Sequence, residues 1–278
     1  MAAKTIRVAH SPDSDDAFMF YALATGAIDT EGLDFVHELN DIESLNQSAR
    51  TGKYEVTAVS IHAYAYLAER YSLLDSGASM GEGYGPILVA RKPLPIEQVS
   101  ESLIGIPGEW TSAFLALRLL EPDFRYQVIP FDQIISAVQE GTIDAGLIIH
   151  EGQLTYQSLG LHNVVDLGQW WQAETGLPLP LGGNVIRRDL GQELIAKVGR
   201  LLKESIRYAL KNRQAALDYA SQFSRGLTQE QEDRFVQMYV NNRTLSYGED
   251  GRRAVQLFLD RGYQAGHLPS KVMVAFVI

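Results

Sequence analysis

Apolar and polar positions along the first 70 residues repeat with two alternating periods. Short apolar runs of strand character are each followed by a stretch in which apolar residues recur every three to four positions. This pattern predicts strands at residues 5–9, 33–38 and 56–60, and helices at residues 17–25, around Leu45 and Ala49, and at residues 62–70. Strands alternating with helices indicate an α/β fold with a mostly parallel, doubly wound sheet.

A glycine- and proline-rich stretch at residues 81–86 interrupts this alternation and precedes a strand predicted at residues 87–91. We expect the chain to cross there into a second lobe. The second series predicts strands at residues 103–106, 126–129 and 145–149, and helices at residues 112–120 and 132–140. Further glycines and prolines at residues 176–183 mark the return crossing, before a short strand at residues 185–187.

The remainder, from residue 192 onward, has a helical pattern, and Thr228 with Gln231 is typical of a capping-box helix start. We therefore assign residues 1–90 and 184–278 to lobe one and residues 91–183 to lobe two. The two crossings form a two-stranded hinge, with a cleft between the lobes. Open α/β sheets bind ligands beyond the carboxyl ends of their strands, so the residues that follow each strand are candidates for a site.

Composition narrows the classes of ligand. The chain has 278 residues, a formal net charge of −10 and no cysteine. An acidic protein repels phosphate backbones and anionic lipid, which argues against nucleic acid and membrane partners and favours a small molecule. The lack of cysteine excludes disulfides, thiolate metal sites and a cysteine nucleophile. The spacing of histidines and glycines matches no metal or nucleotide motif, so we expect no metal site.

The N-terminal residues lead directly into a strand pattern without the apolar segment of a secretory signal, and no apolar run approaches the roughly 20 residues of a membrane span. We therefore expect a cytoplasmic protein.

The loop after the first strand contains Ser11, Asp13, Asp15 and Asp16. Its hydroxyls and the following helix start can hold an anion, although the three carboxylates oppose this. Alternatively the loop only caps the helix, with Asp15 or Asp16 as the N-cap residue. A cation site made by the aspartates is a weaker alternative, because the spacing lacks the glycine and glutamate of an EF-hand loop.

Hydroxyl residues also follow two other strands. Ser60 ends the third strand and either donates to a ligand oxygen or caps the next helix. Thr111 and Ser112 place two hydroxyls beside the unpaired N–H groups of a helix start, which favours a carboxylate cradle over a simple N-cap.

His150 is the leading catalytic candidate. It follows the apolar strand at residues 145–149 directly, where an ionisable imidazole faces the predicted cleft. Histidine titrates near neutral pH and can remove a proton from a bound substrate. Glu151 is a weaker candidate, because an extended chain would point it the other way.

Several segments together resemble the 1,4-dihydroxy-6-naphthoate synthases of the futalosine route to menaquinone. The strongest likeness is Leu-Ile-Ile-His-Glu-Gly-Gln-Leu-Thr-Tyr at residues 147–156, followed by Val-Asp-Leu-Gly-Gln-Trp-Trp at residues 165–171 and Thr-Gly-Leu-Pro-Leu-Pro-Leu-Gly at residues 175–182. The likeness covers most of residues 5–190. It implies a periplasmic-binding-protein-like type II fold used as a cytoplasmic enzyme, without a redox or metal cofactor.

The resemblance also implies roles for single residues. His150 matches the catalytic base, Thr111 and Ser112 match substrate contacts, and the residues implied to form another contact strand are Ala58, Val59 and Ser60. The reaction implied is cleavage of a carbon–carbon bond in cyclic dehypoxanthine futalosine, which releases 1,4-dihydroxy-6-naphthoate and a three-carbon fragment.

The chain departs from the family pattern in two places. The usual opening Ser-Pro-Cys-Pro-Asn-Asp-Thr-Phe reads Ser-Pro-Asp-Ser-Asp-Asp-Ala-Phe at residues 11–18, and Ala58 stands where a lysine is expected. Two other functions share this fold. A solute-binding protein would deliver a small carboxylate to a transporter, and chorismate dehydratase is the sister enzyme; the histidine motif at residues 147–156 favours the naphthoate synthase.

Overall fold

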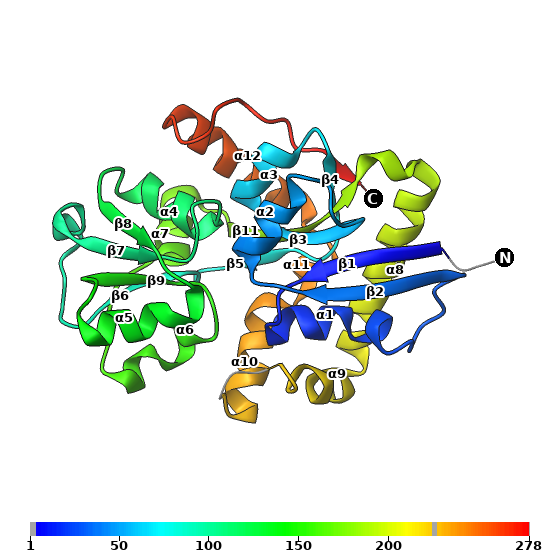
Figure 1. Ribbon diagram of the computed structural model, residues 1–278, viewed down its shortest axis with the longest axis horizontal. Coiled ribbons are helices and arrows are strands. Elements are labelled where there is room, and N and C mark those ends of the chain that lie inside the picture. The colour runs from blue at the N-terminus through cyan, green and yellow to red at the C-terminus, as the bar shows by residue number, and fades with distance from the viewer. Residues whose placement is uncertain (1–3, 224–226, 278) are drawn as a thin grey trace.

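The computed structural model describes residues 4–223 and 227–277, which form two lobes (Figure 1). Lobe one begins with β1 (Lys4–His10), α1 (Ser14–Ala24), β2 (Leu33–Leu39), α2 (Ile42–Ala49), β3 (Val56–Ser60), α3 (Ile61–Leu67), β4 (Tyr71–Leu74) and β5 (Ser79–Gly81). Lobe two contains β6 (Ile87–Ala90), β7 (Leu103–Ile106), α4 (Ser112–Leu120), β8 (Arg125–Val128), α5 (Ile134–Glu140), β9 (Ala145–Ile148), α6 (Gly152–Thr155), β10 (His162–Asp166) and α7 (Leu167–Thr175).

The chain returns to lobe one through β11 (Leu179–Arg187) and continues with α8 (Gln192–Lys211), α9 (Arg213–Ala220), α10 (Gln229–Tyr239), α11 (Asn242–Leu245), α12 (Gly248–Gln264) and β12 (Phe276–Val277). Short 3₁₀ segments occur at Ile96–Glu101, Phe131–Gln133, Tyr156–Leu159 and Arg188–Leu190. None of the helices in the part of the chain that the structure describes is long and apolar enough to cross a membrane.

The larger sheet has the order β12-β4-β11-β3-β1-β2 with β5 paired to β11, and the smaller sheet has the order β10-β6-β9-β7-β8. The prediction of two α/β lobes agrees with the structure, in which each lobe has its own sheet and both sheets are mixed. Antiparallel pairings are as frequent as parallel ones, however, so the expectation of mostly parallel sheets is wrong. The reason is that β6, β10 and β11 enter their sheets against the direction of the neighbouring strands.

The two crossings between the lobes form a paired hinge. β5 pairs antiparallel with β11 through Leu179↔Gly81 and Gly182↔Ser79, and Figure 1 shows both strands between the lobes. β6 pairs within the smaller sheet and β11 within the larger one. The strand pairings therefore place the passages before β6 and before β11, rather than at the expected boundaries after residues 90 and 183.

Most predicted elements agree with the structure within a few residues, and the capping box of Thr228 and Gln231 at the start of α10 is confirmed. The structure corrects two predictions. β11 starts at Leu179, not at residue 185, because its proline and glycines resembled turn residues while they pair with β5 and β3. α1 starts at Ser14 with Asp13 as its N-cap residue, so neither Asp15 nor Asp16 caps it.

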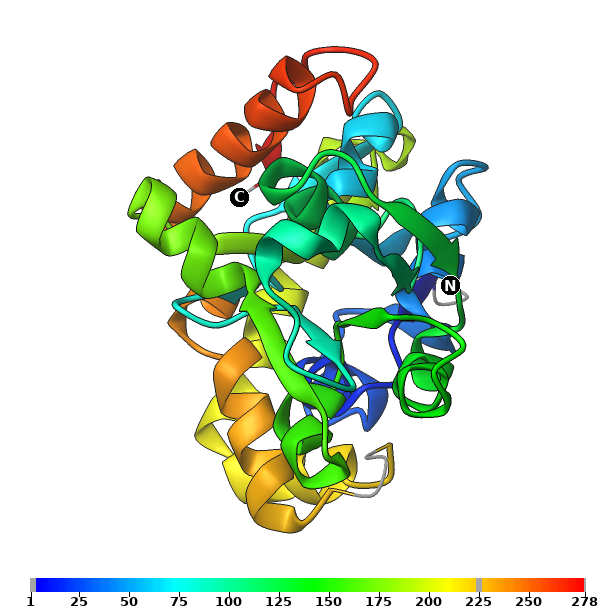
Figure 2. The same cartoon turned by 90° about the vertical axis from the view of Figure 1, so that its left-hand side faces the viewer.

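Apolar packing positions the cleft. On one face of the larger sheet, Val8, Val56 and Ile186 pack with residues of α1 and α8. On the other face, α3 belongs to a continuous core cluster that extends into α4 of lobe two and α12. Figure 2 shows the C-terminal helices, coloured orange and red, flanking the molecule on two sides of the hinge. The lobes are therefore in apolar contact on one side, and polar residues gather on the side where strands of both sheets end.

Candidate functional site

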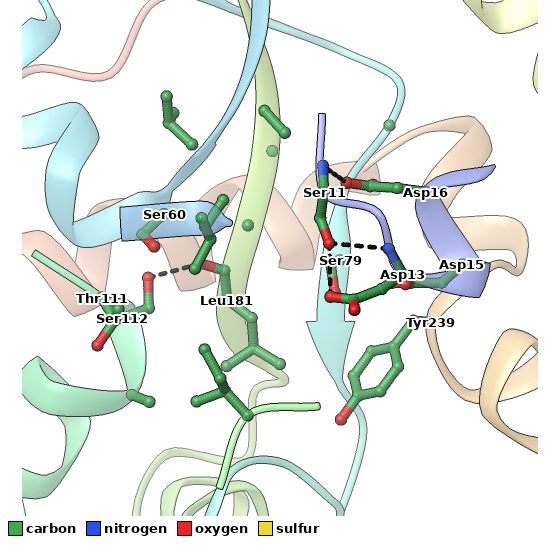
Figure 3. A pocket seen from close by; sticks show the side chains of 18 of the residues that line it. Ser11, Asp13, Asp15, Asp16, Ser60, Ser79, Thr111, Ser112, Leu181 and Tyr239 are labelled. Carbon is green, nitrogen blue, oxygen red and sulfur yellow. Dashed lines mark hydrogen bonds between the residues drawn. The ribbon is translucent and has the colours of Figure 1, made fainter. Parts of the chain in front are cut away.

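A cavity lies between the lobes where β1, β3 and β11 of lobe one face the start of α4 in lobe two (Figure 3). Among the predicted site residues, those that line it are Ser11, Ala58, Val59, Ser60, Thr111 and Ser112. These residues come from three strand ends of two different sheets. The structure thus brings together side chains that the sequence separates by as many as 101 positions.

Hydrogen bonds across the cavity hold the lobes together. Ser14 Oγ of α1 donates to Glu151 Oε1 at 3.1 Å, and Tyr239 Oη of α10 donates to Gln153 Oε1 at 2.8 Å. On the opposite side the Trp110 N–H donates to Glu43 Oε2 at 3.3 Å. These contacts join the first loop and helices of lobe one to the loops of lobe two, so the structure represents a closed arrangement of the lobes.

The hydroxyl protons of Thr111 and Ser112 are used within the protein. Thr111 Oγ1 donates to the Gly108 carbonyl at 2.8 Å and accepts from the Phe114 N–H at 3.2 Å, as an N-cap residue does. Ser112 Oγ donates to the Leu181 carbonyl at 2.6 Å. The first N–H groups of a helix have no carbonyl within the helix to bind, and Ser112 and Ala113 line the cavity at the start of α4. A ligand carboxylate here would be bound by backbone N–H groups rather than by these hydroxyls.

Ser60 is held in a different way. Its N–H donates to Asn46 Oδ1 at 2.9 Å, and its Oγ accepts from Asn46 Nδ2 at 3.2 Å. Ser60 is the N-cap residue of α3 but makes no capping bond through its side chain. Asn46 therefore orients the Ser60 hydroxyl so that its oxygen accepts a hydrogen bond. The hydroxyl proton is then available for a ligand oxygen, and the side chain does not cap the helix.

The opposite wall of the cavity is acidic. Asp13, Asp15 and Asp16 line it, and Figure 3 shows them across the cavity from Ser60, Thr111 and Ser112. The Ser11 N–H donates to Asp16 Oδ2 at 2.7 Å, and Ser11 Oγ donates to Asp13.

Burial controls the charge of this wall. Burial raises the pKa of Asp16 to about 7, and the charge of Asp13 adds to the shift. Burial also raises the pKa of Asp15 well above its usual value, with further contributions from Asp16 and Asp13. No lysine, arginine or histidine is among the described residues that line the cavity. Burial therefore favours the protonated forms of Asp15 and Asp16. The described residues include no group of three acidic or histidine side chains arranged for a metal ion.

His150 lies two residues beyond the end of β9, next to the cavity wall but not among its lining residues. Its Nδ1 accepts from the Gly152 N–H at 3.0 Å, so Nε2 carries the proton and donates to the Phe131 carbonyl at 3.1 Å. Ile149 and Gln153, on either side in sequence, do line the cavity. The imidazole is therefore adjacent to the site, and its role as a base stays a prediction.

The lining residues that the sequence analysis did not single out include three with polar side chains, Gln153, Asn184 and Tyr239. Gln153 and Tyr239 meet only because α10 returns to lobe one and packs beside the cleft, and no local pattern encodes that contact. Asn184 carried a usable signal, since it is a lone amide between Gly183 and the apolar residues Val185 and Ile186.

Comparisons with known proteins agree with this geometry. A family profile described as menaquinone biosynthesis matches residues 6–264. A 1,4-dihydroxy-6-naphthoate synthase of Thermus thermophilus is 41% identical over 253 residues, which cover 91% of this chain and 92% of the relative. A 1,4-dihydroxy-6-naphthoate synthase of Streptomyces coelicolor is 33% identical over 277 residues, covering 97% of each chain.

Solved structures show the same architecture. A crystal structure from Archaeoglobus fulgidus has a TM-score of 0.91 and 46% identity, covering 94% of this chain and 98% of that chain. The alkanesulfonate-binding protein SsuA of Xanthomonas axonopodis has a TM-score of 0.74 and 12% identity, covering 99% and 97% of the two chains. At that identity the likeness establishes only the periplasmic-binding-protein fold, as predicted.

Proposed function

This chain belongs to the menaquinone-biosynthesis family, and on that premise we propose that it is a lyase that converts cyclic dehypoxanthine futalosine into 1,4-dihydroxy-6-naphthoate. The observation that carries the proposal is the match over nearly the whole chain to two synthases of that name, together with a cavity between the lobes at the expected strand ends. A cytoplasmic location, where a biosynthetic enzyme would meet its substrate, is part of the proposal.

The cavity suggests how the substrate lies. The N–H groups at the start of α4 suit the carboxylate of the substrate, and Ser60 suits a second oxygen. The lobe contacts made by Ser14 and Tyr239 would exclude water and fix the substrate for reaction.

His150 is the proposed general base. It takes a proton from a hydroxyl or acidic carbon of the substrate; the carbon–carbon bond then breaks and the bicyclic product becomes aromatic. For this step the imidazole must turn from Phe131 and Gly152 toward the cavity, where Ile149 and Gln153 already line the wall.

The test is a turnover assay with purified protein and cyclic dehypoxanthine futalosine, followed by mass spectrometry for the dihydroxynaphthoate. We expect His150→Ala to lower turnover on the order of 10²- to 10⁴-fold, as loss of a general base does. His162→Ala, which removes an exposed histidine at the start of β10 in the same lobe, is the matched control and should retain wild-type turnover. Absence of product from the wild-type protein would refute the function; a His150→Ala variant with more than about a third of wild-type turnover would refute only the base.

A further inference from the structure

Asn184 is a buried amide at the floor of the cavity. It lies in β11, lines the cavity, and exposes only 1% of its surface. Its neighbours Val185 and Ile186 are fully buried apolar residues. Buried amides in proteins are normally hydrogen-bonded at both ends, so both the nitrogen and the oxygen of this side chain are expected to have a hydrogen-bond partner.

The donor end of the amide is fixed by Gly77. Asn184 Nδ2 donates to the Gly77 carbonyl at 3.1 Å. Gly77 has a φ of +84°, and a Cβ at that position would lie 2.2 Å from Asn184 Nδ2, so glycine leaves the room that the amide occupies. A reversed amide would place its oxygen against the Gly77 carbonyl, and two acceptors repel. The orientation of the side chain is therefore determined.

The acceptor end has no partner. Asn184 Oδ1 is buried and receives no hydrogen bond from any of the residues that the structure describes. An unpaired buried acceptor destabilises a folded protein, so a ligand that supplies the missing donor gains affinity there. A hydroxyl or N–H group of a ligand satisfies this oxygen, whereas a carboxylate is repelled by it.

The surroundings of Asn184 are also rich in acceptors. Asn184 pairs with Ala58, two residues from the pair Ile186↔Val56, so side chains of both pairs point to the face that α1 covers. The start of α1 brings Asp15 and Asp16 to the same cavity. Figure 3 shows these carboxyls on the side away from Thr111 and Ser112. The cavity thus has helix N–H groups at one end, and the Asn184 oxygen together with the carboxyl groups of Asp15 and Asp16 at the other.

We propose that Asn184 is a specificity-determining residue whose side-chain oxygen accepts a hydrogen bond from a hydroxyl of the substrate part that leaves as the three-carbon fragment. This inference rests on the proposed function, because it assigns the two ends of that substrate to the two ends of the cavity. The carboxylate lies at the start of α4, and the sugar-derived hydroxyls lie between Asn184 and the start of α1. Gly77 acts as the positioning residue for the amide.

The test compares the substrate with the naphthoate product, which lacks the hydroxyl-bearing fragment. Asn184→Leu has a similar volume and removes the acceptor. We expect this variant to raise the KM for cyclic dehypoxanthine futalosine on the order of 10-fold, the value of about one hydrogen bond, while the inhibition constant of 1,4-dihydroxy-6-naphthoate changes less than about twofold. Thr57→Val is the control. It removes a hydroxyl that is equally buried in β3 but opposite Val185, on the other face of the sheet, and both constants should stay at wild-type values.

Each other outcome overturns the inference. An equal loss of affinity for substrate and product means that Asn184 shapes the whole cavity, and no loss for either means that its oxygen binds nothing. Circular dichroism checks folding, and Asn184→Ala, which also lacks the acceptor, replaces the leucine variant if that variant is unfolded. If the wild-type protein forms no product, titration calorimetry measures binding of cyclic dehypoxanthine futalosine to wild type and to the variant. Weaker binding by the variant supports the role of Asn184 although the proposed reaction is refuted. Equal binding, or no binding, refutes both the reaction and the role of Asn184.

Discussion

The buried carboxyls of the acidic wall make the stability of the protein depend on pH, and the contribution of Asp16 can be isolated by substitution. Asp16 accepts a hydrogen bond from the Ser11 N–H, and the amide oxygen introduced by the substitution Asp16→Asn can accept the same bond. The substitution therefore removes the titrating group while it keeps the local contact and the size of the side chain.

The sign and size of the effect follow from the pKa. Burial raises the pKa of Asp16 to about 7 in the folded protein, whereas the pKa of an aspartate in an unfolded chain is about 3.9. Folding therefore favours the protonated form, and this contribution is fully present below about pH 4 and is lost as the pH rises through about 7. Between pH 5 and pH 8 the loss extends over about two pH units, at about 1.4 kcal/mol each, or about 3 kcal/mol.

Urea unfolding at pH 5 and pH 8 measures this quantity. Wild type should lose about 3 kcal/mol of unfolding free energy between pH 5 and pH 8 through Asp16, and Asp16→Asn should not. The free energy of unfolding of the variant minus that of wild type should therefore be about 3 kcal/mol larger at pH 8 than at pH 5. Asp123→Asn removes an exposed carboxylate outside the cavity and should leave the wild-type pH dependence in place. A difference between Asp16→Asn and wild type that is the same at both pH values would refute the assignment of a buried, proton-holding carboxyl.

Two further substitutions test the contacts that close the cavity. Ser112→Ala deprives the Leu181 carbonyl and the His62 N–H of their shared hydroxyl partner, so the free energy of unfolding should fall by about 2 kcal/mol; a loss below about 0.5 kcal/mol would contradict the structural role of that hydroxyl. Tyr239→Phe removes the bond to Gln153 and should increase the open population about fivefold, seen as faster amide hydrogen exchange in α6; exchange at the wild-type rate would mean that this bond does not hold the lobes.

The sequence predicts the parts of the fold in which local chemistry and burial agree. α4 runs from Ser112 to Leu120 as predicted, because the Thr111 cap and the apolar periodicity specify the same start and face. β11 was shortened in the prediction because Pro180 and its glycines read as turn residues, although they serve a hinge that pairs with β5. The start of α1 was placed too late, because Asp15 and Asp16 were assigned to the loop before the helix, whereas Asp13 is the N-cap residue and both aspartates lie in the first turn of α1 beside the cavity.

The site was predictable to the extent that topology alone assembles it. Strand ends of open α/β sheets converge, and that rule brought Ser11, Ser60 and Ser112 to one cavity. The hydrogen-bond partners of these groups could not be predicted, because Leu181 reaches Ser112 only through the return strand of the hinge. For the same reason the sequence could not indicate that the hydroxyl protons of the α4 start are already engaged.

Under the proposed function, the acidic wall and the start of α4 together would let a protein with a net charge of −10 accept an anionic substrate. No basic side chain among the described lining residues faces the ligand, so the positive end of α4 must balance a carboxylate, an interaction of about 0.3–2 kcal/mol. That gain is small and would be cancelled by ionised carboxylates across the cavity. The raised pKa of Asp16 lessens this repulsion near and below neutral pH, since a protonated carboxyl does not repel a carboxylate and can donate to it. Under the proposed function, the proton of Asp16 that stabilises the fold is therefore also the proton that lets the acidic wall face a carboxylate-bearing substrate.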